Sequence, residues 1–482
     1  MFLGLDLGTT NVKAVLSDAA GRVLARGSAG VRLYHEDDRV EQEIEEIWDA
    51  TLAAIRAAGE NAELSAVRAV GVSAQGGALQ LLGPQGEPRG RVISWLDGRG
   101  DAWNEAITDE LGAEWFADHT GHGRSGVAVG QLLRMRDEAP DAIEVPNRIG
   151  FVGDVVVERL CGTRAHDPTS LSLPVLLNPQ LEEADPQLLA RLGIGESQLP
   201  RLEAATSPAG GLLREVAERT GLPAGIPVSP AVHDQYAAAL GSNAVRAGDV
   251  MFGAGTAWVL LAVTDRLHRP VTPDTFVCPH PVAGLYGQLL SLVTGGSAFT
   301  WGLRMVGLED RGAEKIDTLL EDVSPGCDGL RFWPFLVAGG GEGLEAGVRG
   351  RFEGLRLAHD KAHVLRSVVE GLALELTRYL RFFTNAGTEV ERLIMSGGAS
   401  ASRVTPRVLA DCTKVPVTCL SEPDASALGG AMIARAMTET GSDLVRISDE
   451  MTPEIRTVEP GEDTETYEQM FREYVRSLPH RK

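Results

Sequence analysis

The 482-residue sequence is poor in positive charge and in cysteine. Its 45 lysines and arginines are outnumbered by 67 aspartates and glutamates, so the formal net charge is −22. A negative field of this size repels nucleic-acid backbones and argues against nucleic acid as a partner. The five cysteines are scattered, without a CxxC pair or zinc-ligand spacing. We therefore expect free, buried thiols in a reducing cytosol.

Long apolar segments and two common nucleotide-binding loops are also missing. No apolar run approaches the ~18 residues of a membrane span, and the sequence begins as a strand, without the basic and apolar regions of a signal peptide. We therefore expect a soluble, cytoplasmic protein with no membrane partner. Neither GxxxxGK(S/T) nor a GxGxxG following an apolar strand occurs, which excludes a P-loop as a phosphate site.

Glycine, by contrast, is abundant, with 56 residues, and indicates many tight turns. The length exceeds what one hydrophobic core usually supports, so we expect two domains of about 200–250 residues each. Residues 67–73 read as a strand, while 42–58 and 360–383 have the apolar spacing of helices. This alternation predicts an α/β fold.

Two segments about half a chain apart have the same pattern, an apolar strand that meets a Gly-Thr turn and leaves as a second strand. They are FLGLDLGTTNVKAVLSD at 2–18 and VMFGAGTAWVLLAV at 250–263. Either turn could be a plain hairpin, but two of them in similar halves could hold one phosphate chain. Asp6 strengthens this interpretation, because a buried carboxylate costs several kcal/mol unless it is paired or coordinated.

A second aspartate, Asp234, follows an apolar strand in PVSPAVHDQYAAALG, residues 227–241. It could cap the following helix, where aspartate contributes ~1 kcal/mol. It could equally accept a proton from a substrate hydroxyl that attacks a phosphoryl group. We expect its neighbour His233 to pack or orient rather than to react.

Polar and aromatic residues gather in the segment 72–100. Gln75 leaves a strand, and Trp95, Asp97 and Arg99 follow another. A ring beside an amide, a carboxylate and a guanidinium suits a polyhydroxylated ligand. The alternative is a turn closed by contact between Asp97 and Arg99. Farther on, VERLIMSGGAS at 390–400 predicts a strand–glycine–helix crossover where a nucleotide could bind.

These motifs together resemble the FGGY carbohydrate kinases, in xylulokinase-like form, of the actin-like ATPase superfamily. The resemblance runs in order through residues 4–18, 73–82, 94–99, 226–241, 252–258, 294–301 and 395–434. It implies an α/β fold of two similar actin-like, ribonuclease H-like ATPase domains that flank a central cleft. The expected domains are residues 1–242, with the sugar site, the first phosphate loop and the catalytic aspartate, and residues 243–482, with the second phosphate loop and the adenosine site.

The resemblance also implies a set of site residues and the cofactors ATP and Mg²⁺. Asp234 would be the catalytic base, and Asp6 and Asp234 would contact the metal shell. Nucleotide would be bound by Gly8, Thr9, Thr10, Asn11, Lys13, Gly255, Thr256, Gly397, Gly398 and Ala399. The sugar would be bound by Gln75, Gly76, Trp95, Asp97, Arg99 and Asp234.

Departures from the family pattern leave the substrate open. Gly76-Gly77-Ala78 stands where xylulokinases usually have Met-His-Gly, and Gly341 to Glu345 lacks the arginine of Gly-Glu-Arg-x-Pro. We expect phosphorylation of a ketopentose such as D-xylulose, with another ketose, a sugar acid or a polyol as alternatives. An actin-like ATPase without a sugar acceptor is the alternative of another class. A dead sensor would be expected to lack Asp6 or Asp234, and both are present. A homodimer is possible.

Overall fold

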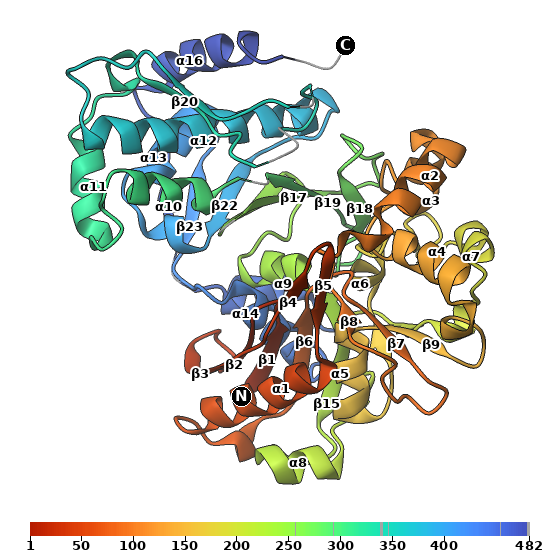
Figure 1. The fold of residues 1–482 in the computed structure, drawn as a ribbon. Helices are drawn as coiled ribbons and strands as arrows, with labels where there is room; N and C mark the ends of the chain where they lie inside the picture. The colour runs from red at the N-terminus through yellow and green to blue at the C-terminus, as the bar shows by residue number, and fades with distance from the viewer. Residues whose placement is uncertain (256, 293, 338–340, 346, 454, 480–482) are drawn as a thin grey trace. The chain divides into compact units, whose positions relative to one another are not determined.

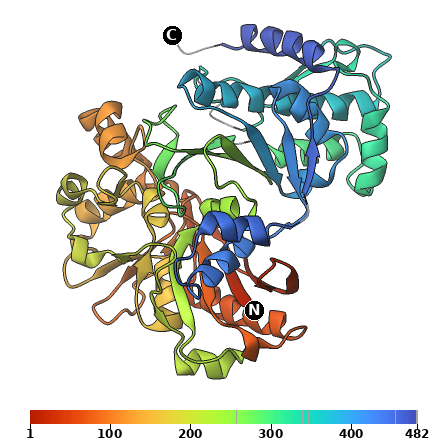
Figure 2. The same cartoon turned by 180° about the vertical axis from the view of Figure 1, so that it is seen from behind.

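The computed structural model describes residues 1–255, 257–292, 294–337, 341–345, 347–453 and 455–479. It contains two compact units, whose ribbons appear in Figures 1 and 2. The first comprises Met1–Arg246, Asp265–Gln288 and Asp424–Thr452, and the second comprises Ala247–Thr264, Leu289–Pro423 and Pro453–Lys482. The division after residue 242 stays a prediction, because these units follow spatial packing rather than chain order.

The central sheet of the first unit has the order β13-β10-β15-β6-β1-β2-β3, with β14 beside β15. β1 and β2 form the expected antiparallel hairpin, whereas β1, β6 and β15 run parallel. The carboxyl ends of β1, β6 and β15 therefore lie side by side. The bounds are β1 Phe2–Leu7, β2 Asn11–Ser17, β3 Val23–Gly30, β6 Val70–Ala74, β10 Ala165–His166, β13 Arg201–Leu202, β14 Gly210–Gly211 and β15 Pro227–His233.

The hydrophobic core of this unit lies between the sheet and its helices. Leu3, Leu5 and Leu7 of β1 are fully buried and share a cluster with Ile47 and Leu52 of α1 (Ile44–Gly59), the helix expected at 42–58. Alternate apolar residues on the strand and a 3.6-residue apolar period on the helix produce this contact. The other helices of the unit are α2 Asp101–Leu111, α3 Ala113–Thr120, α4 Ala128–Glu138, α5 Val152–Cys161, α6 Pro168–Ser172, α7 Pro186–Leu192, α8 Arg214–Thr220, α9 Asp234–Gly241, α14 Ala425–Ala436 and α15 Leu444–Met451.

Helix α14 packs unusually close to the sheet, and glycine makes this possible. A Cβ atom on Gly4 of β1 would lie 1.7 Å from the carbonyl oxygen of Ala427, and one on Gly71 of β6 would lie 1.9 Å from that of Gly430. Any side chain at either position would displace the helix. Because α14 starts at Ala425, this approach brings a segment more than 400 residues along the chain to the edge where β1 and β6 end.

A smaller sheet of the first unit supports the segment around Trp95. Its order is β4-β5-β8-β7-β9. The strands of this sheet are β4 Tyr34–Glu36, β5 Arg39–Gln42, β7 Leu79–Leu82, β8 Val92–Ile93 and β9 Arg148–Phe151. Three strands of this unit lie outside it: β11 Leu177–Asn178 and β12 Glu183–Ala184, which pair with each other, and β18 Phe276–Pro279.

The second unit repeats the strand pattern of the first. β16 and β17 form an antiparallel hairpin, and β16 pairs in parallel with β22, as β1 does with β6. This confirms the internal similarity expected from the two Gly-Thr segments. The strands are β16 Asp249–Ala254, β17 Trp258–Thr264, β19 Tyr286–Leu292, β20 Arg331–Trp333, β21 Arg351–Glu353, β22 Arg392–Ser396, β23 Val417–Leu420 and β24 Ile455–Val458, and the helices are α10 Gly296–Met305, α11 Ala313–Glu321, α12 Lys361–Asn385, α13 Thr405–Thr413 and α16 Thr464–Arg476.

Two expectations from composition can also be compared with the structure. All five cysteines are free and buried, as predicted. Across the part of the chain that the structure describes, no helix combines the length and the apolar character that crossing a membrane requires.

Candidate active site

Three predicted polar residues lie at the ends of three neighbouring parallel strands. Asp6 is in β1, Gln75 directly follows β6, and Asp234 directly follows β15. The registers pair Asp6 with Ser73 and His233 with Ala74, so the three residues lie at one edge of the sheet. The carboxyl ends of parallel strands are where α/β proteins usually bind ligands. The first unit therefore assembles much of the predicted site without help from distant loops.

Asp6 is held by two serines. Ser73 and Ser426 hydroxyls donate to its Oδ1 at 3.2 and 3.1 Å. Burial and, to a smaller extent, the nearby charge of Asp234 raise the pKa of Asp6 to about 6, although Lys13 opposes the shift. The carboxyl group is thus poorly stabilised as an anion by the protein alone.

Asp234 is the first residue of α9, one position after the N-cap residue His233. Burial raises the pKa of Asp234 to about 6, and hydrogen bonds from Gln235 only partly oppose the shift. A carboxyl group poised near neutral pH can exchange a proton with a substrate, which a simple helix cap does not need.

The donor set of Asp6 and Asp234 fits a magnesium ion. The charge of Asp234 disfavours the ionisation of Asp6, and a bound divalent cation would favour the charged form of both carboxyl groups. Mg²⁺ usually takes one or two protein carboxylates and completes its shell with water and phosphate oxygens. Among the described residues there is no group of three or more His, Cys, Asp or Glu side chains that could hold a metal ion.

Thr9, in the turn after β1, makes hydrogen bonds to two of the predicted sugar-binding residues, Gln75 and Trp95. The Thr9 hydroxyl donates to Oε1 of Gln75 at 3.0 Å and accepts from the indole Nε1 of Trp95 at 3.2 Å. Gln42 donates to the Thr9 carbonyl at 2.8 Å and accepts from Gln75 Nε2 at 2.9 Å. One hydrogen-bonded group therefore links the predicted phosphate turn to Gln75 and Trp95.

The rest of that turn is compact. The backbone N–H of Gly8 donates to the carbonyl of Asn11 at 3.1 Å, and Asn11 Nδ2 donates to the hydroxyl of Thr10 at 3.1 Å. Thr10 and Asn11 are exposed, so their polar groups are accessible. Lys13, directly across the hairpin from Asp6, places its ammonium 2.9 Å from Oδ1 of Asp424, just before α14.

Asp97 and Arg99 make the turn contact that was the alternative to sugar binding. The side chain of Asp97 is fully buried and accepts from Arg99 at 2.7 Å, from the backbone N–H of Val40 at 2.8 Å and from Gln131 at 2.9 Å. Burial alone would raise the pKa of Asp97, but these partners outweigh it and hold that pKa below its usual range. Trp95 at the start of the same turn is 48% exposed. Its ring is thus available to a ligand while the Asp97–Arg99 pair fixes the turn.

The space beside Gly76 is already filled by the protein. A Cβ atom there would lie 2.6 Å from Cγ of Leu173 and 2.7 Å from Cδ2 of His233, and one on Gly77 would lie 2.3 Å from Cγ1 of Val127. The packing therefore leaves no room for a larger side chain at position 76 or 77.

In the second unit, the predicted nucleotide residues lie at the ends of β16 and β22. The register pairs Gly253 with Ser396, so Gly255 and Gly397 follow neighbouring strand ends. Gly397 has a φ of 93°, and a Cβ there would lie 2.9 Å from the carbonyl oxygen of Ala254. Gly398 and Ala399 begin a short 3₁₀ helix, and nothing lies within 4 Å of a Cβ built on Gly398. Thr256 lies outside the described residues.

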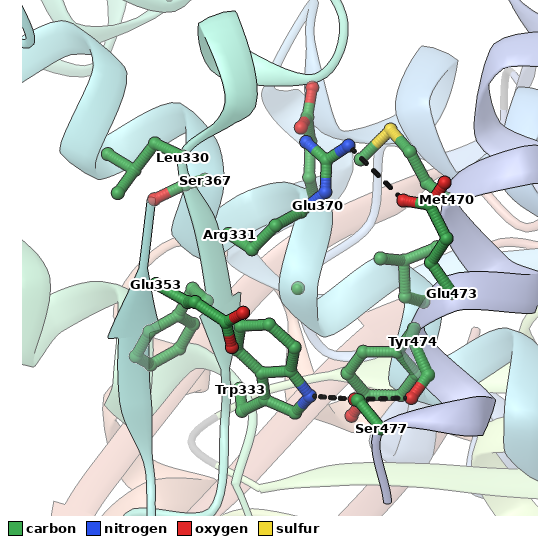
Figure 3. Close-up of a pocket in the computed structure, with 13 residues that line it drawn as sticks. Leu330, Arg331, Trp333, Glu353, Ser367, Glu370, Met470, Glu473, Tyr474 and Ser477 are labelled. Carbon is green, nitrogen blue, oxygen red and sulfur yellow. Dashed lines mark hydrogen bonds and ion pairs between the residues drawn. The ribbon is translucent and has the colours of Figure 1, made fainter. Parts of the chain in front are cut away.

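A cavity of about 140 Å³ in the second unit contains none of the predicted site residues (Figure 3). It lies between β20, α12 and α16, where the indole of Trp333 donates to the hydroxyl of Ser477 at 2.9 Å. Its buried acid, Glu370, accepts from the Tyr467 hydroxyl and from Arg366, at 2.9 and 3.1 Å. These contacts are structural, so we do not assign the cavity to the active site.

Sequence reasoning missed Ser73, Ser426 and Gln42. Ser73 had a usable signal, because it is two residues before Gln75 on a strand and therefore points to the same side. Ser426 and Gln42 had none, since they come from α14 and from the smaller sheet and meet the site only in the folded chain.

Comparisons with known proteins show the family of this chain. Models of the N-terminal and C-terminal domains of the FGGY family of carbohydrate kinases match residues 1–241 and 250–438. The chain is 23% identical to a xylulose kinase of Bacillus subtilis, covering 100% of this chain and 97% of that protein. It is 28% identical to a glycerol kinase of Alkalilimnicola ehrlichii, covering 90% and 89%.

Solved structures give the same result for the fold. A xylulose kinase from Rhodospirillum rubrum superposes with a TM-score of 0.88 at 25% identity, covering 98% of this chain and 97% of that one. A gluconate kinase from Lactobacillus acidophilus, at 22% identity and a TM-score of 0.89 over 98% and 96%, shares the fold. The predicted α/β, actin-like ATPase fold is thus confirmed, and the chain belongs to the FGGY family of carbohydrate kinases.

Proposed function

We propose that this kinase transfers the γ-phosphoryl group of ATP to a hydroxyl of a ketopentose such as D-xylulose, with Asp234 as the general base. The observation that carries the proposal is the placement of Asp6 and Asp234 at the ends of β1 and β15, the two parallel strands that flank β6 and Gln75, each with its pKa raised to about 6. This arrangement combines an acceptor of a proton with a partner for a phosphate-bound cation.

The residues divide the work of the reaction. Asp234 accepts the proton of the sugar hydroxyl as its oxygen attacks phosphorus, while the bond to the departing ADP oxygen breaks. Mg²⁺, when bound by Asp6 and Asp234, supplies positive charge that offsets the phosphate oxygens. In the first unit, Thr9, Thr10 and the neighbouring backbone N–H groups would bind phosphate, together with Gly8, Asn11 and Lys13. In the second unit, Gly255 and Thr256 stay predicted phosphate residues.

The remaining predicted residues are assigned to the adenosine site and to the sugar site. Gly397, Gly398 and Ala399 would line the adenosine site, and no described atom lies within 4 Å of a Cβ built on Gly398. Gln75 and Gly76 would orient the sugar, and Trp95 would stack against its C–H face. Asp97 and Arg99 would serve the sugar site by fixing the turn that carries Trp95.

Support for a ketopentose comes from relatives. Proteins of Bacillus subtilis and Staphylococcus similar to this chain are xylulose kinases, whereas others are a gluconokinase, an L-fuculokinase and a glycerol kinase. The missing Met-His pair is the feature of this chain that weighs against a simple transfer of the xylulose assignment.

An acceptor panel tests the proposal. ADP release would be followed with xylulose, ribulose, fructose, fuculose, gluconate, erythritol and glycerol, each with and without Mg²⁺. We expect Mg²⁺-dependent release that one ketopentose stimulates at least tenfold over the sugar-free rate. ATP consumption that no acceptor stimulates would instead support an ATPase without a sugar substrate and would contradict the proposal.

A further inference from the structure

The side chain of Gln42 lies between the predicted phosphate turn and the predicted sugar-binding amide. Gln42 is the last residue of β5, and α1 begins two residues later at Ile44. Gln42 is fully buried. Its Nε2 donates to the carbonyl oxygen of Thr9 at 2.8 Å, and its Oε1 accepts from Nε2 of Gln75 at 2.9 Å. Both ends of one buried amide therefore hold residues of the candidate site.

The chemistry of these groups fixes the direction of each hydrogen bond. The carbonyl oxygen of Thr9 can only accept, so Gln42 must turn Nε2 toward it and Oε1 toward Gln75. Gln75 must then donate with Nε2 and turn its Oε1 toward the Thr9 hydroxyl, which donates to it at 3.0 Å. The indole N–H of Trp95 can only donate, and the same hydroxyl accepts from it at 3.2 Å. Turning either amide over would place two acceptors against each other.

This order of bonds leaves the amide of Gln75 with one donor for a ligand. Its Nε2 carries two hydrogens, and Gln42 is the acceptor of one of them. The second hydrogen is then available to an oxygen of a bound molecule. Without Gln42, the amide of Gln75 could turn about its last side-chain bond and would present nitrogen or oxygen in turn.

We propose that Gln42 is a positioning residue that holds the amide of Gln75 in one orientation, so that Gln75 presents an N–H donor to an oxygen of the sugar. This rests on the proposed function, in which Gln75 binds the sugar. An amide that is fixed before the sugar arrives loses no rotational freedom on binding, so its hydrogen bond contributes more to affinity. Gln42 therefore acts on the sugar through Gln75 and without touching it.

Substitution by methionine separates this role from packing. Gln42→Met keeps the length of the side chain and removes both hydrogen bonds, and we expect it to raise KM for the sugar about 3- to 10-fold. In a Gln75→Met background, the same substitution should change this KM by less than about twofold, because Gln42 acts through Gln75. A change of the same size in both backgrounds would show a packing role and would overturn the inference.

Gln198→Met is the matched control. Gln198 is also a buried glutamine, and both ends of its amide are hydrogen-bonded, in this case to the backbone of Gly195, Ile143 and Asn147. We expect Gln198→Met to leave KM for the sugar within about twofold of wild type. An increase equal to that of Gln42→Met would mean that loss of any buried amide has this effect, and it would overturn the inference.

A measurement on the unliganded protein tests the contact without any acceptor. In the full chain labelled with ¹⁵N-glutamine, the NMR signals lost in Gln75→Met identify the side-chain amide of Gln75. We expect its Nε2 hydrogens to exchange with solvent about tenfold faster in Gln42→Met than in wild type. Equal exchange rates would overturn the inference. Failure of every acceptor in the panel would overturn the proposed function, while the exchange rates would still show whether Gln42 holds Gln75.

Discussion

Ser426 donates a hydrogen bond to Oδ1 of Asp6 at 3.1 Å, although 420 residues separate them in the chain. The contact exists because α14 packs backbone to backbone on β1 and β6 through Gly4 and Gly71. Asp424, just before the same helix, pairs with Lys13 at 2.9 Å. A C-terminal helix thus completes the carboxylate site of the N-terminal sheet.

Removing this hydrogen bond should weaken the enzyme most at low pH. In Ser426→Ala, Asp6 loses a donor to its charged form, so its pKa rises above about 6 and less anion is present near pH 6.5. We expect kcat to fall roughly 3- to 10-fold at pH 6.5 and less at pH 8. Ser448→Ala, which removes a buried hydroxyl bonded to the Leu240 carbonyl, is the matched control. A loss of equal size at both pH values would contradict this explanation.

The charged form of Asp6 should lower the free energy of unfolding while it supports catalysis. Because burial raises its pKa to about 6, the folded chain retains a proton between about pH 4 and 6 that the unfolded chain has released. The free energy of unfolding therefore falls as pH rises through this window, and the charged group destabilises the fold above it. Asp6→Asn should lower kcat at least ~10²-fold and raise the metal-free Tm at pH 7.5. Calorimetric scans that show a lower Tm at pH 7.5 would count against a destabilising carboxylate.

Substitution of Trp95 should weaken the binding of the sugar and leave the binding of the nucleotide unchanged. Its ring is 48% exposed and anchored to Thr9 by its N–H, so truncation removes a stacking surface. We expect Trp95→Ala to raise KM for the sugar roughly 3- to 10-fold, with KM for ATP within twofold. Trp95→Phe keeps a ring without the N–H, so its KM for the sugar should lie between those of wild type and Trp95→Ala. Equal increases in both KM values would indicate a disturbed Thr9 turn instead.

The acidic residues at the strand ends of this site could be predicted from the sequence, whereas the side chains that hydrogen-bond to them could not. Asp6 and Asp234 could be found because a charged residue in an apolar strand is conspicuous, and β1, β6 and β15 then align by ordinary parallel pairing. The partners of these acids come from elsewhere, as with Ser426, and no local pattern predicts a contact over that separation. The filling of the space at Gly76 by Leu173 and His233 likewise depends on packing that the absence of a side chain cannot reveal.

The buried acid beside the cavity in Figure 3 should be important for stability. Glu370 accepts from Arg366, Tyr467 and the backbone N–H of Gly326 and is 2% exposed. Glu370→Leu leaves Arg366 buried without its anion and should lower the free energy of unfolding of the second unit by ~3–5 kcal/mol.

Glu473 provides the comparison, because it lines the same cavity but its side chain is 52% exposed. Its loss in Glu473→Ala should change stability by less than ~1 kcal/mol. Urea unfolding of both variants measures the difference, and equal midpoints would contradict a special role for Glu370.

Phosphoryl transfer by Asp234→Asn, observed directly by ³¹P NMR with the best acceptor of the panel, tests the central claim. Asparagine keeps the size of the side chain and cannot accept the proton, while Asp185→Asn at the start of α7 controls for the same change at a buried helix cap. The account predicts that wild type and Asp185→Asn form a sugar phosphate and that Asp234→Asn forms it ~10²- to 10⁴-fold more slowly, with ATP affinity retained. A sugar phosphate signal that grows in Asp234→Asn at close to the wild-type rate would contradict it.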